Sequence, residues 1–232
     1  MRRIFCFCLI LIGNCFADKG ESAAPFLKIG ISPRASALGN AYVGLSESPS
    51  SIYYNPAGLS QSKTKEITLM HNMYFEGINH EFLGYIHPLN KQTLGFGITG
   101  LFTDSIPRKT RATLENEGSF KASDYCLILS GGQRIKKNTL GGLSIKIIHQ
   151  ELDKEKGTGI GMDLGLLILR PSMKIGLSLQ NIGPKMKIYK EEFSLPSLFS
   201  FGISLTKNRF LFTSDIKKPL LIEKKKVANY LL

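Results

Sequence analysis

Hydrophobic residues occupy every second position along most of the chain from about residue 64 onward. In one such segment Leu94, Phe96 and Ile98 alternate with threonine and glycine. Because successive side chains of a β-strand point to opposite faces, this period of two predicts strands with one apolar face and one face of small or polar residues. About nine segments show the pattern, at residues 65–75, 79–88, 93–103, 122–134, 139–149, 159–169, 173–182, 196–205 and 209–216.

The lengths of these segments and of their connections indicate strands that cross a membrane. Each segment has roughly 9 to 13 residues, longer than the 5 or 6 typical of globular strands and matched to a tilted membrane-crossing strand. The connections are short after the second, fourth, sixth and eighth segments, and longer at residues 104–121, 150–158 and 183–195. Short turns on one side and long loops on the other are typical of outer-membrane barrels. The predicted fold is therefore all-β, an antiparallel transmembrane β-barrel whose strands occupy residues 64–216.

A soluble secreted β-sandwich is the competing interpretation, because its strands also alternate apolar and polar residues. The solvent-facing side of a sandwich should be rich in lysine, glutamate and threonine. Here the corresponding face is rich in small residues, for example Gly142, Ser144, Gly176 and Ser178. Together with the strand lengths and the loop pattern, these small residues favour the barrel. Glycine at alternating strand positions also predicts close packing against a plug inside it.

Residues 1–17 have the layout of a secretory signal peptide. Arg2 and Arg3 precede an apolar run over residues 4–16, and Ala17 supplies the small residue before the expected cut. A charged segment, an apolar core too short to span a membrane and a small-residue cleavage site are the three parts of such a signal. We therefore expect export across the inner membrane and cleavage. A lipoprotein signal ending at Cys15 is a weaker alternative.

Cleavage would leave Cys126 as the one cysteine of the mature chain, since three of the four cysteines precede residue 18. An intramolecular disulfide or a zinc site built from thiolates is then not expected. Cleavage also removes two arginines, which lowers the formal net charge from +12 to +10. The remaining positive charge is scattered and not interleaved with aromatic residues, which predicts a surface facing water or lipid headgroups and no nucleic-acid partner.

Residues 18–63 do not alternate and are rich in glycine, alanine and serine. They contain Asn55-Pro56-Ala57-Gly58, in which proline fixes φ and the asparagine side chain can bond backbone amides of a turn. An ordinary loop leading to the first strand is one interpretation. The length of the segment favours an N-terminal hatch inside the barrel. The candidate hatch residues are Gly39, Asn55, Pro56, Ala57 and Gly58.

This segment also carries a resemblance to a known family. Residues 33–45, PRASALGNAYVGL, and residues 53–59, YYNPAGL, are similar to the N-terminal signature of the PorV/PorQ family. That family is a branch of the FadL-like (TodX-like) outer-membrane barrels and includes uncharacterised spirochaete members. Weaker matches continue the resemblance to about residue 217, at residues 80–85, 163–166, 176–183 and 195–196.

The resemblance implies a barrel of about fourteen strands, within the size range of bacterial barrels, with Asn55-Pro56-Ala57 as part of the hatch. FadL-like relatives pass long-chain fatty acids or other hydrophobic molecules across the outer membrane. PorV-like relatives serve protein secretion and surface attachment. The chain departs from the family in residues 217–232, a divergent basic tail. An odd strand count and a terminal leucine, Leu232, predict a truncated family member, since bacterial barrels use even numbers.

No catalytic or metal-ligating cluster is evident, because the four histidines are scattered without ligand spacing. We therefore expect no enzyme activity, no cofactor and no metal. The polar candidates for the barrel lumen are Lys146, Asp163 and Lys174. Lys146 and Asp163 lie on successive strands and are expected to neutralise each other. The alternative is that Lys146 or Lys174 binds a fatty carboxylate.

The sequence thus predicts an exported protein of the cell outer membrane that takes up long-chain fatty acids or other hydrophobic small molecules passively. A PorV-like partner in protein secretion and a non-functional truncated family member are the alternatives. The expected partners are outer-membrane lipid, a hydrophobic small-molecule substrate and, for the secretion alternative, exported proteins.

Overall fold

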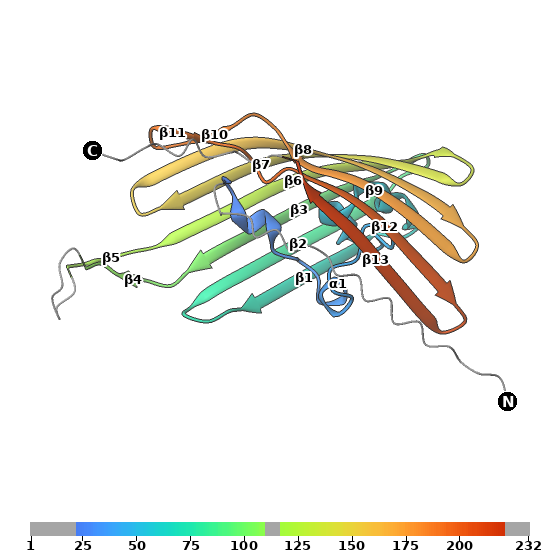
Figure 1. Cartoon of the computed structure of the whole chain (residues 1–232), viewed down its shortest axis with the longest axis horizontal. Coiled ribbons are helices and arrows are strands. Elements are labelled where there is room, and N and C mark those ends of the chain that lie inside the picture. The colour runs from blue at the N-terminus through green and yellow to red at the C-terminus, as the bar shows by residue number, and fades with distance from the viewer. Residues whose placement is uncertain (1–21, 110–116, 221–232) are drawn as a thin grey trace, which may run out of the picture.

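A computed structural model of the chain describes residues 22–109 and 117–220. The expected signal peptide and the end of the basic tail lie outside these ranges. Within them, nine long strands follow one another in a single antiparallel sheet whose spatial order is the order of the chain (Figure 1). They are β1 (Glu66–Met73), β2 (Ile78–Pro88), β3 (Gln92–Thr103), β6 (Ala122–Lys136), β7 (Thr139–Leu152), β8 (Glu155–Arg170), β9 (Met173–Ile182), β12 (Leu198–Lys207) and β13 (Phe210–Pro219).

Four short strands lie in the connections. β10 (Met186–Ile188) and β11 (Glu191–Phe193) extend the sheet to 11 strands, and β4 (Ile106–Pro107) pairs with β5 (Ser119–Phe120) in a separate two-stranded ribbon. The prediction of an all-β, antiparallel fold is confirmed. In the described ranges β1 pairs only with β2, and β13 only with β12.

Each predicted segment overlaps one of the nine long strands, but the long loop expected at residues 150–158 is wrong. β7 and β8 continue through most of this stretch and meet in a turn at Asp153 and Lys154, where Asp153 has a positive φ of 57°. Apart from Leu152, the side chains here are polar or absent, as at Glu151, Lys156 and Gly157. Apolar alternation therefore marks only the central part of β7 and β8, while backbone pairing continues beyond it.

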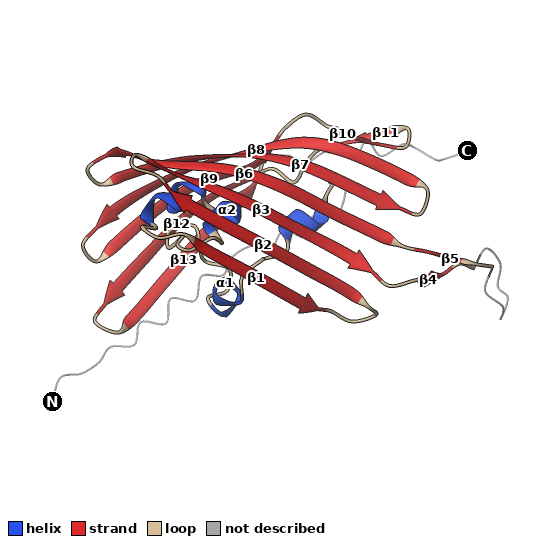
Figure 2. Ribbon diagram, turned by 180° about the vertical axis from the view of Figure 1, so that it is seen from behind, coloured by secondary structure: helices blue, strands red, loops and turns tan. Residues whose placement is uncertain are grey.

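The connections gather at two ends of the sheet (Figure 2). We call one the loop end: it holds the connections at residues 74–77, 104–121, 153–154 and 183–197. The opposite turn end holds the short connections at residues 89–91, 137–138, 171–172 and 208–209. Both of the remaining long connections, with their short strands, therefore lie at the same end.

One face of the sheet exposes large apolar side chains, and the other is buried. The side chains of Leu129, Ile145 and Ile160 are 60%, 51% and 58% exposed. Residues that point to the opposite side of the sheet are buried, and Ser144 and Asp163 are completely so. We call the exposed apolar side the outer face and the other the inner face.

Residues 22–62 cover the inner face, and the sheet curls around them (Figures 1 and 2). We call this segment the hatch. It contains two short 3₁₀ helices, η1 (Pro25–Lys28) and η2 (Pro56–Gln61), and two short α-helices, α1 (Pro33–Ala37) and α2 (Ser51–Tyr54). None of the helices in the described ranges is long and apolar enough to cross a membrane.

The buried core lies between the hatch and the inner face. Ile52 and Leu59 of the hatch pack with Ile128 and Ile148 of the sheet in one cluster. A second cluster joins three hatch tyrosines to Met70 of β1, with Leu211 of β13 packed against it; the tyrosines are Tyr42, Tyr53 and Tyr54. The hatch thus contacts both the first and the last long strand.

Candidate functional site

Asn55, at the centre of the predicted hatch motif, is completely buried and connects three parts of the chain. Its side-chain oxygen accepts a hydrogen bond of 3.2 Å from the Ala57 amide and so caps the start of η2. Its side-chain nitrogen donates to the carbonyl oxygens of Val43, at 3.1 Å, and Leu166 of β8, at 3.2 Å. One amide therefore orders η2, the preceding hatch backbone and the contact with the sheet.

The two hatch glycines have different roles. Gly58 lies against the carbonyl oxygen of Ser46, so a Cβ at this position would overlap that atom. Gly39 has a φ of +64° and no other atom within 4 Å of an added Cβ. Gly58 is therefore required for space, and Gly39 for a left-handed backbone after α1.

A row of glycines on the inner face makes room for the hatch backbone. Gly132, Gly142 and Gly165 are register partners on β6, β7 and β8. A Cβ on Gly142 would overlap Pro56, and a Cβ on Gly132 would lie 2.9 Å from the Pro56 carbonyl oxygen. This contact confirms that glycines at alternating strand positions make close packing contacts with another segment; that the segment is a plug stays a prediction.

A second close contact lies farther along the sheet. Gly176 of β9 and Gly202 of β12 are register partners, and the backbone of Val43 and Gly44 passes directly over them. A Cβ on Gly202 would lie 2.6 Å from the Gly44 nitrogen. We call this crossing the glycine neck.

Alternate side chains of β13 bind the hatch backbone next to the glycine neck. Asp215 Oδ2 accepts hydrogen bonds from the amides of Tyr42, at 2.9 Å, and Val43, at 3.0 Å. Thr213 donates to the carbonyl oxygen of Ala41 at 2.7 Å. Lys217, two residues after Asp215, donates to the carbonyl oxygen of Asn40 at 2.7 Å. The last long strand therefore holds the hatch through side chains, whereas β6 to β8 hold it through close packing.

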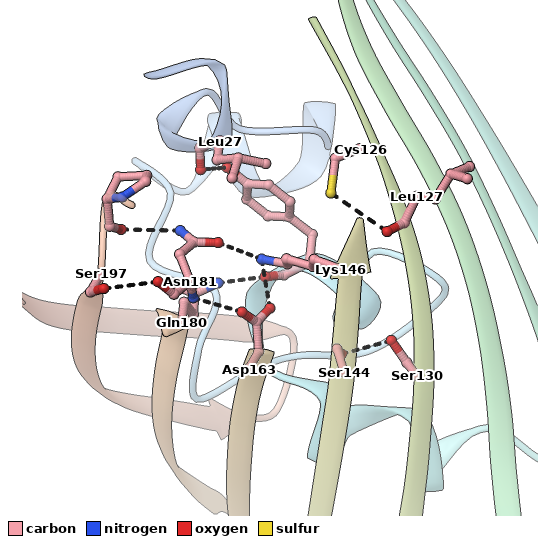
Figure 3. Close-up of polar contacts among 12 residues, drawn as sticks. Leu27, Cys126, Leu127, Ser130, Ser144, Lys146, Asp163, Gln180, Asn181 and Ser197 are labelled. Atoms are coloured by element: carbon pink, nitrogen blue, oxygen red, sulfur yellow. Dashed lines mark hydrogen bonds and ion pairs between the residues drawn. The ribbon is translucent and has the colours of Figure 1, made fainter. Parts of the chain in front are cut away.

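Lys146 and Asp163 form a buried ion pair (Figure 3). Lys146 Nζ lies 2.7 Å from Asp163 Oδ2, and the two side chains are 1% and 0% exposed. Asn181 of β9 completes the cluster, because its side-chain oxygen accepts from Lys146 at 2.7 Å and its backbone amide donates to Asp163 at 2.8 Å. The pairing agrees with the expectation that the two charges neutralise each other.

The third lumen candidate, Lys174, does not join this cluster. Its Nζ lies 3.6 Å from Glu47 Oε2 in the hatch, and the other oxygen of Glu47 lies 2.6 Å from Arg34. All three side chains are partly exposed. The structure therefore separates a closed ion pair in the interior from a solvent-accessible group of charges.

Tyr53 is a site residue that the sequence did not single out. Its hydroxyl lies 2.6 Å and 2.8 Å from the carbonyl oxygens of Leu27 and Ile29, and its own carbonyl accepts a 2.5 Å hydrogen bond from Gln180. Lys146 Nζ lies 5.7 Å from the centre of its ring. Burial raises the pKa of Tyr53 well above its ordinary value, so the hydroxyl remains a donor. An aromatic residue among small ones was the available signal.

The chain matches no protein-family model and no curated protein.

Two cavities lie away from the hatch, at opposite ends of the sheet. One, of about 460 Å³, is at the loop end and is lined by Phe102, Phe120 and Glu151 among others. The other, of about 690 Å³, is at the turn end around Leu89 and Gln133. No group of three or more metal-ligating side chains occurs among the described residues. The candidate site is thus the segment of residues 22–62, held against the inner face of the sheet by close packing and by polar side chains.

Proposed function

We propose that this chain is a FadL-like outer-membrane protein of the PorV/PorQ type. Its curled sheet is part of a transmembrane barrel wall, its outer face contacts lipid, and its hatch occludes the interior. The function we propose is passive uptake of long-chain fatty acids or other hydrophobic small molecules. Release or displacement of the hatch would open the passage.

The observation that carries the membrane location is the exposed apolar outer face. Exposing a large aliphatic side chain to water forgoes about 1.5–3 kcal/mol, and soluble monomers rarely expose large contiguous apolar patches. Here the outer face carries such residues on all nine long strands, among them Leu69, Leu83, Phe96, Leu129, Ile145, Ile160, Leu177, Phe199 and Phe212. Contact with lipid would make this face stable.

The dimensions of the apolar region also support this location. On β8 the outer face is apolar from Ile160 to Ile168. At about 3.3 Å per residue this run is roughly 26 Å long, and at a tilt of about 40° it covers roughly 20 Å of bilayer thickness. Known outer-membrane barrels have an apolar band about 25 Å tall.

The packing of the hatch supports its role as the mobile part of a conduit. Part of its contact with β6 to β8 is made over Gly132, Gly142 and Gly165, where the hatch backbone lies directly on the sheet. Apolar side chains such as Leu59 and Ile128 pack beside these glycines, so displacement must break that packing but meets a smooth surface at the glycines themselves. The hatch remains in place through Asn55 and the side chains of β13.

Gel migration of the protein extracted from outer membranes tests the membrane location. A barrel that resists detergent migrates faster when unboiled than when boiled. Absence from this fraction, or an identical migration of the two samples, would contradict the proposal and favour a remnant that does not assemble.

Locking the hatch tests the uptake function. Ala57 of η2 and Leu140 of β7 pack in one buried cluster. A chain carrying Ala57→Cys and Leu140→Cys in a Cys126→Ser background can be joined there by a short reducible cross-linker. We expect fatty-acid entry into proteoliposomes to stop after cross-linking and to return after reduction. Each single-cysteine variant is the control, and entry that continues in the locked protein would contradict a hatch-controlled conduit.

One observation favours secretion as a second candidate function. The ribbon of β4 and β5 and the pair β10–β11 both lie at the loop end, where they offer backbone and side chains to another protein (Figure 2). Arg108 fixes the base of the first, since its guanidinium lies 2.6 Å from Asp153. Removing residues 106–120 should abolish export of a partner and leave fatty-acid uptake unchanged if secretion is the function.

A further inference from the structure

We propose that the inner wall formed by β9, β12 and β13 is one side of a hydrated path for water and small hydrophilic solutes, closed at the glycine neck. The proposal rests on the membrane location proposed above and is independent of fatty-acid uptake. It adds a second class of solute and assigns the closing element to the backbone of Val43 and Gly44.

Unpartnered polar atoms on this wall carry the inference. Ser178, Ser200 and Ser204 are 2%, 0% and 1% exposed, and none of their hydroxyls has a hydrogen-bond partner among the described residues. Asp215 Oδ1 is likewise buried without a partner there. Buried polar groups in native proteins are almost always hydrogen-bonded to protein or to ordered water. Water is the partner that fits four such atoms on one wall.

The register places these atoms on both sides of the glycine neck. Ser178 of β9 is the partner of Ser200 on β12, and both lie toward the loop end from the neck. Ser204, on the same face of β12, lies toward the turn end. Asp215 is the partner of Gly202, which belongs to the neck itself. Polar positions therefore continue on either side of one narrow backbone crossing.

On the opposite wall, formed by β6 to β8, the buried polar side chains described next have partners. Ser130 and Ser144 on β6 and β7 are buried to a similar degree, but their hydroxyls bond each other at 2.7 Å. Beyond them, Lys146 and Asp163 form an ion pair, which Asn181 of β9 completes. The polar groups of β6 to β8 are thus paired with one another, whereas four polar atoms on β9, β12 and β13 are left for water; His80 Nδ1 on β2 is a further buried atom without a partner among the described residues.

Solvent already reaches the turn end of this wall. Lys174 precedes Ser178 on the inner face of β9 and is the register partner of Ser204. The Lys174 side chain is 26% exposed, and that of its partner Glu47 is 30% exposed. Water that solvates these charges therefore lies next to Ser204, at the entrance of the proposed path.

Cysteine accessibility tests the path. In mature Cys126→Ser protein in liposomes, from which signal cleavage removes the other three cysteines, Ser200→Cys and Ser204→Cys are treated with a small anionic methanethiosulfonate reagent. Because this chemistry needs a hydrated thiolate, we expect both to react at least about tenfold faster than Ser144→Cys, the matched control on the satisfied wall. Equal, slow reaction at all three positions would overturn the proposal. Reaction at residue 204 but not 200 would also overturn it, since the loop side of the neck would then hold no water.

One further variant separates this proposal from the membrane location. Ile145→Cys, on the outer face, should stay unreactive in the same liposomes. If it reacts, the lipid-facing assignment of the outer face fails. Hydration of the inner wall is still judged by the reaction rate of Ser200→Cys relative to that of Ser144→Cys.

Loosening the neck gives a second readout. Asp215→Ala removes the acceptor of the Tyr42 and Val43 amides. We expect liposomes with this variant to swell several-fold faster in a small sugar than those with unmodified protein. Ser130→Ala, on the opposite wall, should not change the rate. An unchanged rate in the Asp215 variant, in protein that still shows the unboiled gel shift, would overturn the assignment of the neck as the closing element.

Discussion

Lys146 and Asp163 are charges with no access to water, and their stability depends on each other. The Coulomb attraction between such groups offsets a large desolvation cost only when the remaining polar atoms are also bonded. Asn181 supplies those bonds, with its side-chain oxygen on the ammonium and its backbone amide on the carboxylate. The cluster therefore fixes β7, β8 and β9 relative to one another beneath the hatch.

Removing one member of this pair should be much more harmful than removing both. We expect Lys146→Met to destabilise the fold by about 3–5 kcal/mol, because it leaves the buried Asp163 carboxylate without a counter-charge. The double variant Lys146→Met with Asp163→Leu should recover most of this loss. The measurement is the temperature at which the unboiled gel band disappears. A double variant no more stable than the single one would show that the pair has another role.

At the scale of elements, the sequence predicted the hatch, the strands and close packing between them, but not which residues meet. Apolar alternation located all nine long strands, because each of them carries large apolar side chains on its outer face. It did not record where pairing ends, so the β7–β8 turn was missed. Asn181 was missed as well. The pairing of β8 with β9 shifts register between Met162 and Leu164, so strict alternation does not predict its contact with Asp163. Glycines predicted close packing, but only the structure shows that Pro56 lies over Gly142.

Gly142 and Gly131 provide a matched test of this contact. An added Cβ on Gly142 would overlap the Pro56 backbone, whereas nothing lies within 4 Å of a Cβ on Gly131. We expect Gly142→Ala to cost about 1–3 kcal/mol through overpacking and to push η2 from the wall. Gly131→Ala should be neutral.

Tryptic cleavage after Arg34 in the folded protein measures the position of the hatch. Faster cleavage in the Gly142 variant than in the Gly131 variant is the expected result. If the two are cleaved at the same rate, the glycine row does not seat the hatch.

For the whole molecule, the inner and outer faces of the sheet differ in which large apolar side chains they carry and in what covers them. The hatch supplies the apolar side chains that bury the centre of the inner face, and the sheet turns most of its own large apolar residues outward. A soluble protein with this arrangement would expose its most hydrophobic surface. The arrangement is stable if lipid covers the outer face, so a charge placed there should be harmful in proportion to its depth in the bilayer.

β7 allows this depth dependence to be tested on one strand. Ile145 lies in the middle of the apolar outer run, whereas His149 faces the same way nearer the loop end. Lysine at the bilayer midplane of a barrel costs about 2–4 kcal/mol, against roughly 0–1 near the interface. We therefore expect Ile145→Lys to lower the amount of unboiled, fast-migrating protein in outer membranes much more than His149→Lys. A soluble sheet would tolerate both exposed lysines, so equal amounts of the two variants would mean that water, and not lipid, covers the outer face.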